Sequence, residues 1–168
     1  MWGMYEGKTA MDMHVVASVR VADVMVKEVI AVDSVVTVRE AVDLMNNYEI
    51  GCLVVLTGSR VDGIVTERDI LKRVIGKSRD VNKTKIKEVM SRPVWVVSPN
   101  TALETALHTM LTRKIKKLPV VKEGRLIGLL TLTDIARFQP KLLNKFKTLL
   151  VKGETPRRIR KVVDCYIS

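Results

Sequence analysis

Apolar and polar positions follow the same order twice along this chain. When the sequence is shifted by 65 residues, residues 21–75 align with residues 86–140 without a gap, and 14 of the 55 aligned positions are identical. Self-similarity at a fixed spacing is typical of a repeated structural unit. We therefore expect two copies of one unit.

Each copy predicts the same succession of strands and helices. A short β-rich run, residues 29–32 or 94–97, precedes a segment with apolar residues at helical spacing, residues 38–45 or 103–110. Two further strands separated by a polar turn follow, and a second helix begins at Thr66 or Thr131. The unit is thus predicted to be β-α-β-β-α, which places the chain in the α/β (α+β) class.

Capping-box sequences mark the first helix of each copy. Thr37 with Glu40, and Thr101 with Glu104, have the Ser/Thr-x-x-Glu form that begins many helices. The second pair lies one residue out of register with the repeat. We expect a capping box at both places.

A unit of about 55 residues exposes more apolar surface than it can cover alone. The two copies are therefore expected to pack together about a pseudo-twofold axis. We divide the chain into an N-terminal extension (1–20), two repeats (21–80 and 81–140) and a basic C-terminal helical tail (141–168).

The composition favours a globular protein in a reducing compartment. Hydrophobic residues make up 47% of the chain and charged residues 28%, and no apolar run approaches the roughly 18 to 20 residues that span a bilayer. Cys52 and Cys165 suggest neither a disulfide framework nor a zinc site. Residues 1–20 lack the apolar stretch of a secretory signal. We expect a cytoplasmic protein without a membrane span or a metal.

Positive charge is concentrated in the tail. The formal net charge is +11, and residues 141–168 hold eight of the basic side chains against Glu154 and Asp164. Helical spacing predicts one helix from Lys141 to Val151 and a second from Arg157 to Tyr166. A solvated amphipathic helix explains such a tail, and contact with nucleic acid is the alternative.

One motif at a strand-to-helix junction occurs in both copies. Residues 63–69 and 128–134 share the pattern Gly-apolar-apolar-Thr-x-x-Asp. The glycine allows another group to approach the backbone, and the Asp can accept hydrogen bonds from both hydroxyls of a ribose. Thr-x-x-Asp is also a capping-box form, so a purely structural role is the alternative. Two copies in register favour a ligand site.

These features resemble a pair of CBS domains, a Bateman module. The resemblance covers residues 21–140 and rests on the tandem repeat, the Val24-Met25 and Val89-Met90 openings and the doubled closing motif. It implies two CBS repeats that bind an adenosyl ligand (AMP, ADP, ATP or S-adenosylmethionine) in two clefts between them. It also implies a regulatory role without catalysis, and commonly a homodimer.

The resemblance assigns residues to both clefts by position. The first would use Ile64, Thr66 and Asp69, with Val94 and Trp95 near the base and Ile115, Lys116 and Lys117 near the phosphates. The second would use Leu129, Thr131 and Asp134, with Val29, Ile30, Ile50, Gly51 and Cys52. Because Gly51 and Cys52 occupy the places of the two lysines, phosphorylated ligands are expected to prefer the first cleft. Glu67 favours AMP slightly over a longer polyphosphate.

Other residues are interpreted as structural. His108 is expected to be exposed and Cys52 to be a packed thiol. Repeat-equivalent or apolar positions suggest a core role for Trp95, Met25, Met45, Met90 and Met110.

The sequence thus favours a regulatory adenosyl-ligand sensor. Two alternatives stay open: a protein that binds nucleic acid through residues 141–168 under nucleotide control, and a regulatory subunit that contacts an enzyme through an apolar face of the tail.

Overall fold

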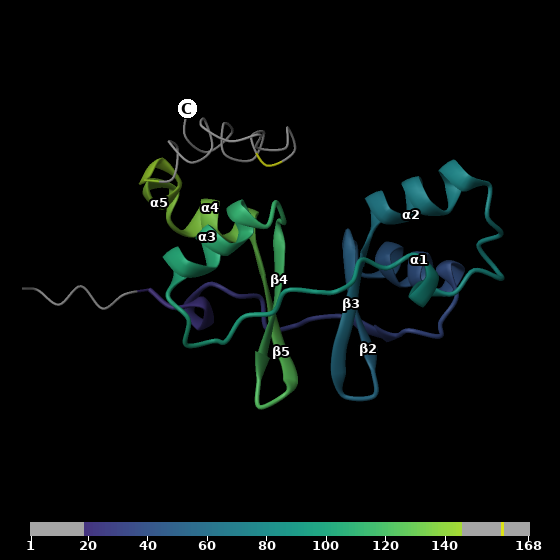
Figure 1. Cartoon of the computed structure of the whole chain (residues 1–168), viewed down its shortest axis with the longest axis horizontal. Coiled ribbons are helices and arrows are strands. Elements are labelled where there is room, and N and C mark those ends of the chain that lie inside the picture. Colours follow the sequence, from purple (N-terminus) through teal and green to yellow (C-terminus); the bar gives the residue numbers. More distant parts are fainter. Residues whose placement is uncertain (1–18, 146–158, 160–168) are drawn as a thin grey trace, which may run out of the picture.

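A computed structural model describes residues 19–145 and residue 159 (Figure 1). The first half contains β1 (Ala31–Asp33), α1 (Val38–Asn47), β2 (Cys52–Thr57), β3 (Arg60–Thr66) and α2 (Glu67–Arg73). The second half contains α3 (Leu103–Thr112), β4 (Lys117–Lys122), β5 (Arg125–Thr131), α4 (Leu132–Phe138) and α5 (Pro140–Lys145). The predicted α+β class and the two repeats are confirmed.

The two halves meet along their sheets. β1 pairs in parallel with β2, β2 pairs antiparallel with β3, and β4 pairs antiparallel with β5. The register is equivalent in the two hairpins, since Leu53 lies opposite Val65 and Leu118 opposite Leu130. Strands β3 and β5 are in contact, and the helices lie on the outer sides of the two hairpins (Figure 1).

The opening strand of the unit differs from the prediction. In the first half it covers Ala31–Asp33 rather than residues 29–32. In the second half it is reduced to one parallel bridge between Val97 and Val120, so the strand predicted over residues 94–97 is wrong. The reason is Pro119, which occupies the place of Val54 and lacks the N–H that Val54 donates to the Ile30 carbonyl at 3.3 Å.

The helix starts also differ between the halves. Thr37 and Glu40 form the predicted capping box, with the Thr37 N–H donating to Glu40 Oε2 at 2.6 Å. The box predicted at Thr101 and Glu104 is wrong, because α3 has Ala102 as its N-cap, in register with Thr37. The first N–H of α3, that of Leu103, donates to the Val19 carbonyl at 2.9 Å, just as the first N–H of α1, that of Val38, donates to the Thr84 carbonyl at 2.9 Å.

The opening segments of the repeats are exchanged between the halves. The buried apolar residues of the described chain form two clusters, one in each half. Val21 belongs to the cluster of the second half, with Leu103 and Leu107. Ile86, its counterpart in the repeat, belongs to the cluster of the first half, with Leu53. Each half therefore completes its core with a segment from the other.

The motif glycines make room for the exchanged segments. A Cβ at Gly63 would lie 2.6 Å from Met90 Sδ, and one at Gly128 would lie 2.6 Å from Met25 Sδ. Real Cβ atoms do not tolerate so short a contact. The group that approaches each glycine backbone is thus a methionine of the opposite repeat.

The C-terminal extension begins by packing on the second half. Leu142 and Leu143 of α5, and the helical Ile159, are buried in the second cluster. The other predicted tail residues, 146–158 and 160–168, lie outside the described residues. Within the described chain, no helix has the length and apolar character needed to cross a bilayer.

Candidate functional site

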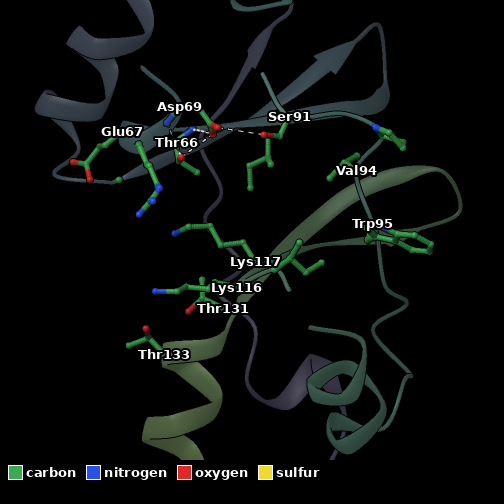
Figure 2. Close-up of a pocket in the computed structure, with 15 residues that line it drawn as sticks. Thr66, Glu67, Asp69, Ser91, Val94, Trp95, Lys116, Lys117, Thr131 and Thr133 are labelled. Atoms are coloured by element: carbon green, nitrogen blue, oxygen red, sulfur yellow. Dashed lines mark hydrogen bonds between the residues drawn. The ribbon is translucent and has the colours of Figure 1, made fainter. Parts of the chain in front are cut away.

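A cleft of about 500 Å³ lies between the two halves. One wall comes from the end of β3 and the start of α2. The other comes from residues 93–95, the segment leading into β4, and the start of α4. Figure 2 shows the two walls facing each other.

The residues expected in the first cleft all line this cavity. They come from three separate segments of the chain, and they are Ile64, Thr66, Asp69, Val94, Trp95, Ile115, Lys116 and Lys117. The fold thus brings together residues from both repeats that are up to 53 positions apart, from 64 to 117.

The chemistry changes along the cleft. Trp95 lies toward one side and the amino groups of Lys116 and Lys117 toward the other, while Thr66 and Asp69 face them from the opposite wall (Figure 2). An aromatic surface, a carboxylate and two ammonium groups therefore border one cavity. These groups suit a flat base, a hydroxyl donor and an anion respectively.

Thr66 and Asp69 form a helix cap. The Thr66 N–H and hydroxyl donate to Asp69 Oδ2 at 3.0 and 2.7 Å, and the Asp69 N–H donates to Thr66 Oγ1 at 3.2 Å. The structural alternative for Thr-x-x-Asp is therefore real in this half. One carboxylate oxygen of Asp69 is committed to the start of α2.

The other oxygen of Asp69 faces a second set of groups. The Ser91 hydroxyl lies 3.3 Å from Asp69 Oδ1, and Arg73 Nη2 lies 3.3 Å from the same oxygen. The Asp69 side chain is only 16% exposed. A ligand hydroxyl that reached Oδ1 would share it with Ser91 and Arg73.

The second copy of the motif has the same cap but different surroundings. Thr131 donates to Asp134 Oδ2 through its N–H at 3.0 Å and its hydroxyl at 2.6 Å. The counterparts of Ser91 and Arg73 are Val26 and Phe138, which offer no hydrogen bond to a carboxylate. The two Asp side chains are therefore not equivalent.

Of the residues expected in the second cleft, only two line the described cavity. Gly51 and Thr131 line the described cleft instead. The remaining residues of that set do not line the cleft. Cys52 is buried in β2, Val29 is half-buried, and Ile30 and Ile50 pack against the core of the first half. Leu129 pairs with Val26, and Asp134 caps α4. The described cleft thus includes two positions that the resemblance assigns to the other.

Several lining residues escaped the sequence analysis as site residues. They are Arg68, Ser91, Pro93 and Thr133. Glu67, which the sequence analysis named for its effect on phosphate length, lines the cleft as well. A signal existed for Ser91, since the repeat places apolar Val26 at the equivalent position. A polar residue where the other copy has an apolar one indicates a role that one copy alone has.

The family follows from comparison with known proteins. Residues 21–76 and 86–141 match the CBS domain. The chain belongs to the CBS domain family. CBS domain pairs are generally regulatory ligand-binding modules.

This chain covers most of one curated relative but only a small part of another. The CBS domain-containing protein YhcV of Bacillus subtilis is 34% identical over 116 residues, which cover 69% of this chain and 82% of YhcV. Inosine-5'-monophosphate dehydrogenase of Methanocaldococcus jannaschii is 38% identical over 127 residues, which cover 74% of this chain but 24% of that enzyme. CBS domains therefore occur both as most of a protein and as part of an enzyme.

A solved CBS pair has the same fold. The crystal structure of the CBS domain pair of protein MJ0100, in complex with 5'-methylthioadenosine and S-adenosyl-L-methionine, matches with a TM-score of 0.66 and 26% identity. The match covers 74% of this chain and 98% of that one.

Of the remaining predictions for single residues, most are confirmed and one is wrong. Cys52, Met45, Met90 and Met110 are buried and His108 is exposed, as expected. Trp95 is 43% exposed, so its interpretation as a core residue is wrong. It lines the cleft, and the Arg113 guanidinium lies 3.9 Å from the centre of its ring. The described residues of this CBS pair bring together no group of three or more His, Cys, Asp or Glu side chains suited to a metal ion.

Proposed function

We propose that this CBS pair is a regulatory sensor that binds an adenosyl ligand in the described cleft and has no catalytic activity of its own. One observation carries the proposal. All the positions that the family resemblance assigns to the first cleft line a single cavity of about 500 Å³. This volume is within the range of small-molecule sites.

The order of groups in the cleft supports a nucleoside. An adenine ring beside Trp95 and Val94 would place the ribose toward Asp69 and a 5' substituent toward Lys116 and Lys117. A solved relative of the same fold holds two adenosyl compounds. The proposal extends that ligand class to this chain.

The charges favour a phosphorylated ligand with a short phosphate chain. Lys116, Lys117 and Arg68 line the cleft and would attract phosphate oxygens, whereas Glu67 lines it too and would repel a long polyphosphate. We therefore rank AMP first, before ADP, ATP and S-adenosylmethionine.

Calorimetric titration of the full chain with these four compounds tests the proposal. Asp69→Asn keeps the size of the side chain but removes the negative charge that a ribose would meet. Asp134→Asn is the matched control, because Asp134 makes the same helix cap in the other half. We expect Asp69→Asn to weaken binding in the described cleft by about tenfold, the size of one hydrogen bond to a charged group.

Two outcomes are informative against the proposal. Equal loss of affinity in both variants would mean that the described cleft is not the preferred site. If none of the four compounds binds the wild-type chain, both Thr-x-x-Asp motifs act only as helix caps.

We further propose that the sensor is a cytoplasmic homodimer. Leu71 and Ile75, at the end of α2 and just beyond it, are 63% and 58% exposed, and a second copy would cover them. The buried free thiol of Cys52 suits a reducing compartment. Sedimentation of wild type and Leu71→Ser tests the dimer, because the variant should shift toward the monomer.

A further inference from the structure

Arg73 connects four polar groups at one edge of the cleft. Its Nη1 donates to the carbonyls of Val89 and Met90 at 2.7 and 2.8 Å. Its Nη2 donates to the Ser91 hydroxyl at 3.0 Å and lies 3.3 Å from Asp69 Oδ1. One side chain thus joins the cleft carboxylate to residues 89–91, the end of the segment that the second repeat contributes to the first half.

Residues 89–91 lead directly into the cleft wall. Ser91 lines the cleft, and the chain continues from it through Pro93 and Val94 to Trp95, which line it as well. Ser91 also pairs with β3, since its N–H donates to the Ile64 carbonyl at 2.8 Å and its carbonyl accepts from the Ile64 N–H at 3.2 Å. The position of Ser91 therefore affects both walls.

The second half shows that this backbone pairing does not need an arginine. Val26, the counterpart of Ser91, exchanges two hydrogen bonds of 2.9 Å with Leu129, the counterpart of Ile64. Phe138 stands there in place of Arg73. Because the same pairing forms without the guanidinium, the contacts of Arg73 add something specific to the first half.

We propose that Arg73 is a positioning residue that couples the occupancy of Asp69 to the segment 89–91. Asp69 Oδ1 already accepts from the Ser91 hydroxyl and faces Arg73 Nη2. A ligand hydroxyl that donates to the same oxygen therefore competes with both groups and changes their contacts. Arg73 passes this change to the Val89 and Met90 carbonyls. This inference rests on the proposed function, since it names the residue through which ligand binding at that site reaches the connection between the repeats.

The test compares Arg73→Leu and Arg73→Lys with Arg39→Leu. Arg39 is a matched control, because its Nε lies 3.2 Å from Asp43 Oδ2 in an i,i+4 ion pair on α1, which does not line the cleft. Each full-length variant is titrated with AMP, ADP, ATP and S-adenosylmethionine. Hydrogen exchange of the Ile64 and Ser91 amides is then followed with and without a saturating amount of the compound that binds.

We expect Arg73→Leu to weaken binding by about tenfold, Arg73→Lys to weaken it less, and Arg39→Leu to leave it unchanged. In the wild-type chain the ligand should slow exchange of the Ile64 and Ser91 amides by about tenfold, within the usual range of coupling between sites. In saturated Arg73→Leu this slowing should be absent. A merely structural arginine would lower stability without removing the ligand's effect on these amides.

Separate results overturn the inference and the proposed function. If the wild-type chain binds and saturated Arg73→Leu shows the same ligand-dependent slowing, Arg73 is not the coupling residue and the sensor function stands. If the wild-type chain binds none of the four compounds, the sensor function fails and the role of Arg73 fails with it.

Discussion

Asp69 makes different contacts with its two carboxylate oxygens. Oδ2 accepts the hydrogen bonds that cap α2, and Oδ1 faces Ser91 and Arg73 at the cleft. The structural and the ligand-binding interpretations of Thr-x-x-Asp are therefore compatible, because each uses a different oxygen. At the scale of the single residue, the site depends on how Asp69 divides its two carboxylate oxygens between the cap of α2 and the groups at the cleft.

Trp95→Ala separates binding from stability. The indole lines the cleft but is 43% exposed, so removing it should change the free energy of unfolding by about 1 kcal/mol or less, including the loss of the Arg113 contact. Stacking of a base on an aromatic ring contributes about 1–3 kcal/mol. Calorimetry with AMP should therefore show a loss of affinity of about tenfold or more.

Phe138→Ala is the control for Trp95→Ala. Phe138 is 53% exposed and does not line the cleft, so its replacement should leave AMP affinity unchanged. Equal affinities in wild type and Trp95→Ala would show that the ligand base does not rest on the indole.

The helices of the two repeats differ in how they begin. Thr37, Thr66 and Thr131 cap α1, α2 and α4 with their side chains. Helix α3 begins at Ala102, whose methyl group cannot accept a hydrogen bond. At the scale of the element, a residue with a side-chain acceptor at position 102 is thus expected to stabilise the start of α3.

Ala102→Ser should stabilise the protein. A serine at this N-cap can accept a hydrogen bond from the first turn of α3, which typically adds about 0.5–1 kcal/mol to the free energy of unfolding. Urea unfolding measures the change, and Thr37→Ala, at the equivalent position, should show a loss of similar size. An unchanged midpoint for Ala102→Ser beside a lowered one for Thr37→Ala would contradict this expectation.

The capping box of α1 predicts a dependence of stability on pH. Hydrogen bonds from the Thr37 side chain and backbone lower the pKa of Glu40 below its ordinary value of 4.5. Since the folded-state pKa is depressed, the stabilisation is present above pH 4.5 and is lost as the pH falls through the folded-state pKa.

Comparison of wild type with Glu40→Gln checks this. The wild type should have the higher urea midpoint at neutral pH, and the difference should shrink below pH 4.5. Glu28→Gln, at an exposed position outside the helices, is the control for loss of a carboxylate elsewhere in the chain. A difference that stays constant with pH would exclude the charge of Glu40 as its source.

The two halves depend on each other for their cores. Val21 and Ile86 occupy equivalent repeat positions. Val21, from the first repeat, is fully buried in the core of the second half, and Ile86, from the second repeat, is fully buried in the core of the first half. At the scale of the whole molecule, the repeats are therefore joined by exchanged segments as well as by the sheets, and the cleft lies where the exchange takes place.

Val21→Ala and Ile86→Ala should act on opposite halves. Each removes buried methyl groups and should cost about 1–4 kcal/mol of unfolding free energy. Hydrogen exchange under native conditions should become faster mainly in α3, β4 and β5 for Val21→Ala, and mainly in α1, β2 and β3 for Ile86→Ala. The reverse pattern would mean that each opening segment supports its own repeat.

The family resemblance supplied the candidate residues of the first cleft by position, and the sequence by itself determined the repeated unit and the order of most elements. These follow from hydrophobic spacing and from a motif that occurs twice, which are local properties that persist whatever the packing. Errors arose where one residue departed from the repeat: Pro119 lacks the donor of a strand ladder, and Ala102, which has no side-chain acceptor, stands at the N-cap in the place of Thr37.

Only the tertiary structure decided which parts meet. The exchange of the opening segments, the close approach of Met25 and Met90 to the motif glycines, and the contacts of Arg73 with residues 89–91 all join positions distant in the chain. Trp95 likewise lines the cleft and is 43% exposed, although its apolar character predicted a core position. Sequence periodicity records which face of an element is apolar, but it does not record which other element will cover that face.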